Sequence, residues 1–298
     1  ELMRKRSDII FITADMGFSV FENLQKEFPE RFFNTGVTEQ SSVGIAAGMA
    51  LSGYKVFFYT LTPFATMRCF EQIRVDVAIQ KTNVVIVGVG SSFTYGQLGP
   101  THHALEDIAL MRSIPGMAVV CPGDPWEAAA ATRVLCRVNI SAYLRLSKSG
   151  EPVVHQKKPV FKLGKGIIVQ QGVDGVLLAT GNMLRTAADV AYLLSGKRIK
   201  MAIVSIHTIK PLDEKLIIDF AKYTKNVFTL EEHSVIGGLG SAIAETLLEK
   251  GVFVDHFHRF GIPDTFTYQA GSQEYLRGLY GLTPKQIAGS ILQILKKR

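Results

Sequence analysis

The chain has 298 residues and a formal net charge of +7, and 47% of its residues are hydrophobic while 20% are charged. This composition excludes intrinsic disorder, collagen and coiled coils, and it predicts a globular chain of about two domains. No apolar run approaches the roughly 18–20 residues of a membrane span, and the N-terminal residues lack the apolar stretch and cleavage site of a signal peptide. We therefore expect a cytoplasmic protein that does not contact membranes.

The excess positive charge lies in short, separated pairs such as residues 157–158 and 197–198 rather than along one face. This distribution favours an anionic substrate or cofactor over nucleic acid, which needs a concentrated basic surface. The cysteines Cys69, Cys121 and Cys136 form no CxxC pair, as expected of reduced, buried thiols. No spacing of His, Cys and carboxylate residues matches a metal site, so none is predicted in this chain.

In the first half of the chain, short apolar segments alternate with helical patterns. The segments at 8–15, 55–61, 83–89, 117–121 and 141–146 are predicted as strands, and those at 39–51, 64–80, 104–113 and 125–137 as helices. Thr38 is a candidate N-cap for the first of these helices, and Gly53 a candidate stop. Nearly continuous apolar strands alternating with helices indicate a parallel sheet covered on both faces.

The composition changes at residues 147–165, which are rich in charge, Gly and Pro and have no helical period. The alternation then resumes, with strands predicted at 175–180, 201–206 and 226–230 and helices at 184–194, 213–223, 240–249 and 284–295. We predict an α/β chain with two parallel-sheet domains, residues 1–150 and 166–298, joined by a linker at 151–165.

Doubly wound sheets bind ligands at the carboxyl ends of their strands, so the segments that follow strands are the candidates for a site. In the first domain these are residues 14–19, 36–40, 62–72 and 90–103. Neither a GxGxxG fingerprint nor a GxxxxGK[ST] loop is present. The glycines of residues 237–240, before a predicted helix, could form a phosphate cradle or could serve close helix–strand packing.

Glu39 opens a predicted helix whose next turns are small and apolar (residues 43–50). It could simply be an acidic residue that the helix dipole favours. Alternatively, small residues allow another backbone or subunit to approach, and a carboxylate at such a dry interface could share a proton with a nitrogen heterocycle.

Four other polar residues lie at the ends of predicted strands or in the loops that follow them. Of His102 and His103, one is a candidate acid/base or oxyanion donor, and a loop histidine bonded to the backbone is the alternative. Arg145 and Lys148 could bind an anion or belong to a solvated face.

Four motifs together resemble the C-terminal half of a transketolase. They are GVTEQ at 36–40, FATMRCFEQIR at 64–74, GPTH followed by ALEDIALMRSIPGM at 99–117, and LEEHSVIGGLGSAIAE at 230–245. The resemblance covers essentially the whole chain, from TADMG onward, and is to split transketolases, whose halves are separate chains. The wider relatives, 1-deoxyxylulose-5-phosphate synthase and the β subunits of 2-oxoacid dehydrogenases, share the pyrimidine-binding and C-terminal domains.

This resemblance implies thiamine diphosphate as the cofactor. Glu39 matches the glutamate that hydrogen-bonds N1′ of the aminopyrimidine and thereby promotes loss of the thiazolium C2 proton. Phe64 matches the aromatic residue that stacks on the pyrimidine ring, and the same motif places Arg68 and Gln72 beside the cofactor.

The resemblance also implies the substrate-binding residues. His102 matches the histidine that hydrogen-bonds substrate oxygens and assists proton transfer. Asp15 and Ser19 match positions that line the cofactor and substrate channel. Lys148 stands where an arginine commonly binds the substrate phosphate.

Three positions depart from ordinary transketolases. Gly90 replaces a substrate-contacting histidine, Leu98 replaces an aspartate that contacts the acceptor hydroxyl, and Lys148 keeps the charge of an arginine without its bidentate geometry. Losing polar partners changes the preference for hydroxylated sugars, so the usual pentose and hexose phosphates are in doubt as substrates.

The GDG…N segment with which transketolases bind Mg²⁺ and the diphosphate does not occur in this sequence. An N-terminal, diphosphate-binding transketolase subunit is therefore expected to supply both, in an α2β2 assembly. The predicted activity is transfer of a two-carbon ketol unit from a ketose or ketose phosphate to an aldose. One alternative is the β subunit of a 2-oxoacid or acetoin dehydrogenase. The other is a non-catalytic regulatory homologue, and the presence of Glu39 argues against this second alternative.

Overall fold

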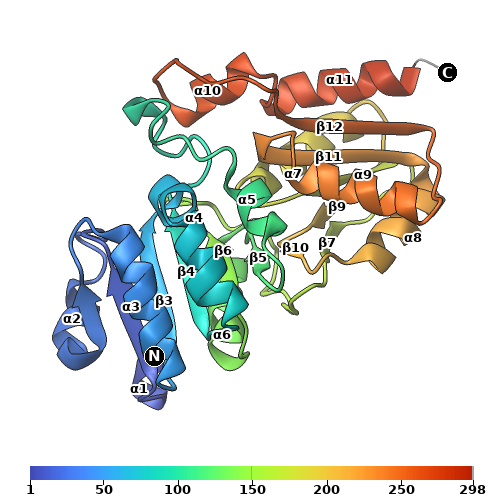
Figure 1. The fold of residues 1–298 in the computed structure, drawn as a ribbon. Helices are drawn as coiled ribbons and strands as arrows, with labels where there is room; N and C mark the ends of the chain where they lie inside the picture. Colours follow the sequence, from blue (N-terminus) through green and yellow to red (C-terminus); the bar gives the residue numbers. More distant parts are fainter. Residues whose placement is uncertain (149, 297–298) are drawn as a thin grey trace.

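Two sheets, one of seven strands and one of five, organise the computed structural model, which describes residues 1–148 and 150–296. They lie side by side, with the N-terminal half of the chain around the first sheet and the C-terminal half around the second (Figure 1). Position 149 of the predicted first domain and positions 297–298 of the predicted second domain lie outside the described residues. The predicted fold class, two α/β domains, is confirmed.

The first sheet has the strand order β10-β5-β6-β4-β3-β1-β2. Its strands are β1 (Ile9–Thr13), β2 (Phe32–Asn34), β3 (Lys55–Leu61), β4 (Val84–Val89), β5 (Ala118–Val120), β6 (Ala142–Arg145) and β10 (Thr208–Lys210). All neighbouring pairs are parallel except β10 and β5. Every residue of the central strand β4 is buried, because helices cover both faces of the sheet, as the continuous apolar pattern predicts.

Helical segments connect these strands. They are α1 (Leu2–Lys5), α2 (Glu22–Glu27), η1 (Pro29–Arg31), α3 (Glu39–Leu51), η2 (Phe64–Arg68), α4 (Phe70–Gln72), η3 (Ile73–Ile79), η4 (Gly96–Leu98), α5 (Asp107–Ser113) and α6 (Pro125–Arg137). Helix α6 begins where predicted because Asp124 accepts a hydrogen bond from the amide of Glu127 and Pro125 occupies the first turn. The single helix predicted at 64–80 is wrong in detail, since α4 lies between two π-helical segments, η2 and η3.

The second sheet has the order β12-β11-β8-β9-β7, with β7 antiparallel to β9 and the other pairs parallel. Its strands are β7 (Ile167–Gln170), β8 (Gly175–Ala179), β9 (Met201–Ser205), β11 (Asn226–Ser234) and β12 (His256–Ile262). The helices of this half are α7 (Met183–Ser195), α8 (Glu214–Thr224), α9 (Leu239–Glu249), α10 (Gln273–Leu279) and α11 (Pro284–Lys296). Strands β7 and β12 and helix α10 were not predicted; β7 and β12 are edge strands with exposed positions, so neither reads as a continuous apolar run.

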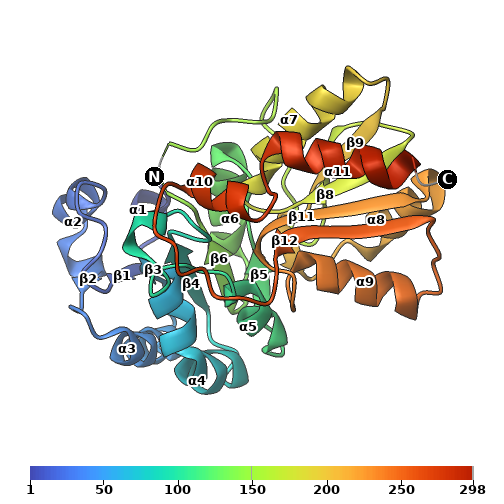
Figure 2. The ribbon, with the colours of Figure 1, turned by 90° about the horizontal axis from the view of Figure 1, so that it is seen from above.

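The two halves are joined by more than the linker. Strand β10, from the C-terminal half, pairs with β5 and so completes the first sheet. Helix α10 and the loop before it pack on the loop that follows β4, where the amide of Gly271 donates to the carbonyl of Gly96 at 3.2 Å (Figure 2). Residues of both halves of the chain therefore hold the loop after β4.

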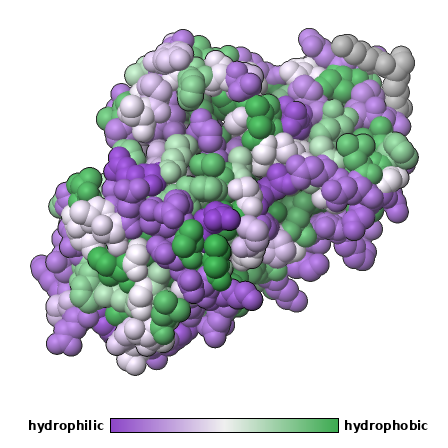
Figure 3. All heavy atoms as spheres, viewed as in Figure 1, coloured by the Kyte–Doolittle hydropathy of each residue, from purple (hydrophilic) through white to green (hydrophobic). Residues whose placement is uncertain are grey.

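Hydrophobic side chains lie among hydrophilic ones on the face that carries α3 and α4 (Figure 3). Val37, Ile45, Leu51 and Ile79 are exposed there, on or beside α3 and the segment at 64–79. Within the described ranges, no helix combines the length and apolarity that crossing a bilayer demands.

Candidate functional site

The carboxyl ends of four parallel strands bring the predicted site segments to one edge of the first sheet. Asp15 follows β1, Phe64 follows β3, the segment from Gly90 to His102 follows β4, and Lys148 follows β6. This edge is where ligands bind in doubly wound sheets.

Glu39 is the first residue of α3 and is only 3% exposed. Its Oε2 accepts a hydrogen bond from Nη1 of Arg68 at 2.7 Å. Thr38 does occupy the N-cap position, but its hydroxyl donates to the carbonyl of Thr35 instead of capping the helix. The carboxylate is thus buried beside the positive end of the helix dipole and has one charged partner.

The π-helical segment η2 places Phe64 and Arg68 on one face, next to Glu39. The Arg68 guanidinium carbon lies 4.4 Å from the centroid of the Phe64 ring, and the His102 ring meets the same ring edge-on at 5.4 Å. Each π turn holds more residues than an α turn, which re-aims the side chains, and such turns recur at functional sites. Glu39, Arg68, Phe64 and His102 therefore form a contiguous cluster.

The two adjacent histidines have different environments. His103 is buried, its Nε2 lies 3.3 Å from the carbonyl of Gly96, its ring packs edge-on against Phe93, and burial lowers its pKa. His102 is half-buried, and its Nδ1 lies 2.9 Å from the Thr101 hydroxyl. The backbone-bonded alternative thus applies to His103, and His102 remains the candidate acid/base.

Asp15, Ser19 and Gln72 are the other residues that the resemblance assigns to the site of the first domain. Asp15 and Ser19 have positive φ angles of 50° and 63° and are exposed, and the amide of Asp15 donates to Oδ1 of Asn34. The Gln72 amide nitrogen donates to Glu71 at 2.6 Å, whereas its Oε1 is buried without a partner. No hydrogen bond within residues 1–148 and 150–296 joins these three side chains to Glu39, so their roles stay predictions.

Arg145 does not belong to an anion site, and that interpretation is wrong. Its guanidinium is buried and donates to both carboxylate oxygens of Asp107, at 2.7 and 3.1 Å, and to the carbonyls of Ala104 and Glu232. The solvated-face alternative is wrong as well. Arg145 ties β6 to α5 and to β11, whereas Lys148 is exposed.

The phosphate cradle considered at residues 237–240 is also wrong. The carboxylate of Glu231 already occupies the N-terminus of α9, where it accepts from the amides of Leu239 at 2.7 Å and Gly240 at 2.8 Å. A Cβ added to Gly238 would lie 2.0 Å from Glu231 Oε2. The close-packing alternative is confirmed, because a Cβ on Gly240 would lie 2.8 Å from the Thr229 hydroxyl of β11.

The two departures in the loop after β4 have different surroundings. Gly90 has a φ of +75°, and a Cβ built on it would lie 2.1 Å from the Tyr95 ring. Leu98 is 54% exposed. The Tyr95 ring therefore occupies the space in which a side chain at position 90 would stand. The glycine in the sequence did not by itself indicate which residue fills that space.

Both halves of the chain match the domains of one family. Residues 1–152 match the transketolase pyrimidine-binding domain, and residues 164–287 match the transketolase C-terminal domain. This chain belongs to the transketolase family. The predicted resemblance is confirmed, and membership implies a thiamine diphosphate-dependent transferase.

Three individual transketolases are similar along the whole chain. An apulose-4-phosphate transketolase subunit of Phocaeicola vulgatus is 36% identical over 299 residues, which cover 100% of this chain and 95% of that protein. The 6-deoxy-6-sulfo-D-fructose transketolase subunit of Clostridium sp. (strain MSTE9) is 34% identical, covering 100% and 92%. A solved split-gene transketolase, described as an inactive β4 tetramer, has a TM-score of 0.91 and 35% identity, covering 100% and 95%. This chain is thus similar along its whole length to subunits of split transketolases.

Proposed function

We propose that this chain is the β-type subunit of a two-chain transketolase that transfers a two-carbon ketol unit from a ketose, free or phosphorylated, to an aldose. The cluster of buried Glu39 with Phe64, Arg68 and His102 at the carboxyl edge of the first sheet carries the proposal. The relatives named as transketolase subunits support it.

The side chains of this edge fit the aminopyrimidine of thiamine diphosphate. Glu39 presents a buried carboxylate that would accept a hydrogen bond from protonated N1′, and Phe64 offers an aromatic face for the ring. Arg68 holds the carboxylate in place at 2.7 Å, and Oε1 of Gln72 is a buried acceptor that meets no donor among the described residues. When bound, thiamine diphosphate supplies the electron sink for carbon–carbon bond cleavage.

The overall reaction balances without an oxidant or reductant. The C2–C3 bond of the ketose breaks, C3 leaves as the carbonyl carbon of an aldehyde, and a new bond forms between the two-carbon unit and the carbonyl carbon of the acceptor. The C3 hydroxyl of the donor loses the proton that the acceptor's carbonyl oxygen gains. We assign the exchange of that proton to His102, since an imidazole side chain can both donate and accept a proton.

We further infer that the partner chain binds the diphosphate and Mg²⁺. Among residues 1–148 and 150–296, no group of three or more His, Cys, Asp or Glu side chains is arranged to hold a metal ion. The outer face of α3 suits a subunit contact, because Ile45 and Leu51 are exposed and a Cβ on Gly44 or Gly48 would meet no atom within 4 Å. We infer an α2β2 assembly, with each site between chains.

We also infer a cytoplasmic location. Cys69, Cys121 and Cys136 are buried free thiols, which suits a reducing compartment.

The decisive experiment compares the isolated chain with the complex reconstituted from a diphosphate-binding transketolase subunit. We expect the isolated chain to bind thiamine diphosphate weakly and to show no turnover, and the complex to transfer ketol units. Tight binding with activity in the isolated chain would contradict the split site. Decarboxylation of pyruvate in place of ketol transfer would favour the 2-oxoacid dehydrogenase alternative.

A variant of Glu39 tests the chemical role directly. We expect Glu39→Ala to abolish C2–H/D exchange of the bound cofactor in the complex, followed by NMR, because the proton at N1′ loses its acceptor. Glu30→Ala makes the same chemical change at an exposed position and is the matched control. Exchange at a near-normal rate in Glu39→Ala would remove Glu39 from the mechanism, and equal rates with no turnover in any variant would favour the regulatory homologue.

A further inference from the structure

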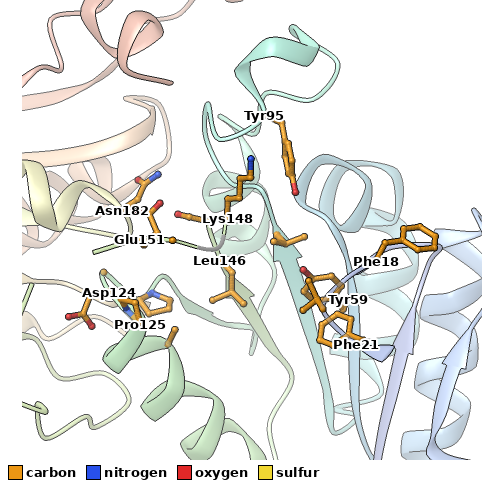
Figure 4. A pocket seen from close by; sticks show the side chains of 17 residues that line it. Phe18, Phe21, Tyr59, Tyr95, Asp124, Pro125, Leu146, Lys148, Glu151 and Asn182 are labelled. Atoms are coloured by element: carbon orange, nitrogen blue, oxygen red, sulfur yellow. The ribbon is translucent and has the colours of Figure 1, made fainter. Parts of the chain in front are cut away.

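A cavity of about 580 Å³ opens at the same edge of the first sheet as the Glu39 cluster. It lies at the ends of β1, β3, β4, β5 and β6, and Asn182 at the start of α7 also lines it. Four aromatic rings, those of Phe18, Phe21, Tyr59 and Tyr95, form one part of its wall, and Lys148 and Glu151 lie toward Asn182 (Figure 4). The cavity thus has an aromatic part and a polar part.

The ring of Tyr95 forms the part of this wall that lies beside Gly90. Its ring lies where a side chain at position 90 would point, with Cε2 and Cδ2 at 2.1 and 2.3 Å from a Cβ built on Gly90. The next residue, Gly96, is packed closely against the C-terminal half, since a Cβ there would lie 2.5 Å from Leu276 and 2.7 Å from the carbonyl of Gly271. A polar side chain at position 90 and this ring position exclude each other, so the choice of glycine gives the cavity an aromatic surface.

The polar part has little positive charge. Lys148 is the one ammonium among the cavity residues, and its Nζ lies 5.9 Å from the Tyr95 ring centroid. Glu151 and Asp124 are also among the residues that line the cavity, but the Asp124 carboxylate points away from it (Figure 4). Asp124 is already engaged by backbone amides, including that of Val154 at 3.0 Å, and burial raises the pKa of Glu151. A phosphate dianion here would meet one cation and the carboxyl group of Glu151.

The aromatic part, in contrast, is uncharged. Burial raises the pKa of Tyr59 to about 12, so its hydroxyl keeps its proton. The remaining wall includes Val89, Leu146 and Pro122. Apolar groups that leave water for such a surface gain about 25 cal/mol per Å² of buried area.

We propose that this cavity binds the distal end of an aldehyde acceptor that is apolar and unphosphorylated, such as a deoxy sugar, and that Tyr95 is the residue that determines this specificity. The inference rests on the ketol transfer proposed above and names the acceptor class for the same site. Lys148 and Glu151 would then meet hydroxyl groups of the acceptor rather than a phosphate.

The test measures kcat/KM of the reconstituted complex with hydroxypyruvate as donor and three acceptors: 5-deoxyribose, ribose 5-phosphate and glycolaldehyde. We expect 5-deoxyribose to be preferred over ribose 5-phosphate. Tyr95→Ala should reduce that preference about tenfold or more, since it removes the apolar contact that discriminates between the two. Tyr95→Phe keeps the ring and should keep the preference, and circular dichroism and the thermal midpoint check folding of both variants.

The outcomes separate the two proposals. A complex that uses glycolaldehyde but prefers ribose 5-phosphate overturns the apolar acceptor and leaves ketol transfer intact. A preference for 5-deoxyribose that survives in Tyr95→Ala overturns the role of Tyr95. A complex that uses none of the three acceptors overturns the ketol transfer itself, and the acceptor class with it.

Discussion

The buried pair Asp107–Arg145 makes the strongest prediction about stability. Two hydrogen bonds join the guanidinium to the carboxylate at 2.7 and 3.1 Å, and the Tyr143 hydroxyl donates to the same carboxylate at 2.6 Å. Both charged groups are buried. Burial alone would raise the pKa of Asp107, but Arg145 and Tyr143 outweigh it and hold the pKa below its usual value.

Asp107→Asn should therefore leave a buried, unpaired guanidinium. Removing one partner of a buried ion pair costs about 3–5 kcal/mol, a large part of the roughly 5–15 kcal/mol that a domain has. Tyr143→Phe removes one hydrogen bond to a charged acceptor and should cost about 1.5–3 kcal/mol. Asp219→Asn is the control, because Asp219 pairs with Lys215 at the surface and should change the free energy of unfolding by at most about 0.5 kcal/mol.

Urea unfolding of the purified chain at pH 7, followed by far-ultraviolet circular dichroism, gives the three free energies of unfolding. A loss of less than about 1 kcal/mol in Asp107→Asn would refute the reasoning, since such a pair would not be buried in a low-dielectric environment. A loss in Tyr143→Phe equal to that in Asp107→Asn would also refute it.

Two further changes test the packing of the C-terminal half and the linker. Gly238→Ala should lower the free energy of unfolding by about 1–3 kcal/mol, because its Cβ would lie 2.0 Å from the Glu231 carboxylate, whereas Gly289→Ala, with no atom within 4 Å, should be neutral or stabilising; equal thermal midpoints would contradict this. Burial alone would lower the pKa of His155, but Glu127, 2.7 Å away, outweighs it and raises the pKa above 6.5. The pair therefore stabilises the folded chain fully below pH 6.5 and loses this contribution as the pH rises through the raised value. The difference in urea midpoint between the unsubstituted chain and His155→Asn should shrink as the pH rises above about 6.5, and a constant difference would count against the pair.

The carboxylate of Glu231 at the N-terminus of α9 shows how a glycine-rich turn can mislead. Gly238 and Gly240 give the backbone the close approach that a phosphate would need, and the amides do point at an acceptor. The group that the amides bond is instead the carboxyl group of Glu231, a side chain of the neighbouring strand β11 whose pKa burial raises to about 7. Glu231 precedes the turn by only a few residues, so both the carboxyl group and the glycine-rich turn are visible in the sequence. The sequence does not show that they contact each other.

Local patterns were enough to predict several elements. Helices α3 and α6 and strand β3 have the predicted bounds, since capping residues, apolar runs and turns act over a few residues. The motif around Glu39, Phe64 and His102 was likewise legible, because the resemblance depends on residue types at fixed spacings. The contact of Arg68 with both Glu39 and Phe64 could not be predicted from the sequence. A π-helical turn has one extra residue, which apolar periodicity does not detect.

Composition, alternation and motifs thus determined the fold class, the family and the chemical types available at the edge of the first sheet. The tertiary structure decided which of them are available to a ligand. It buried Arg145 against Asp107, filled the N-terminus of α9 with Glu231, and placed the Tyr95 ring over Gly90. It also paired β10 with β5, a strand more than 80 residues away in sequence. These outcomes depend on contacts between distant segments, and a sequence specifies such contacts only through the packing of the whole chain.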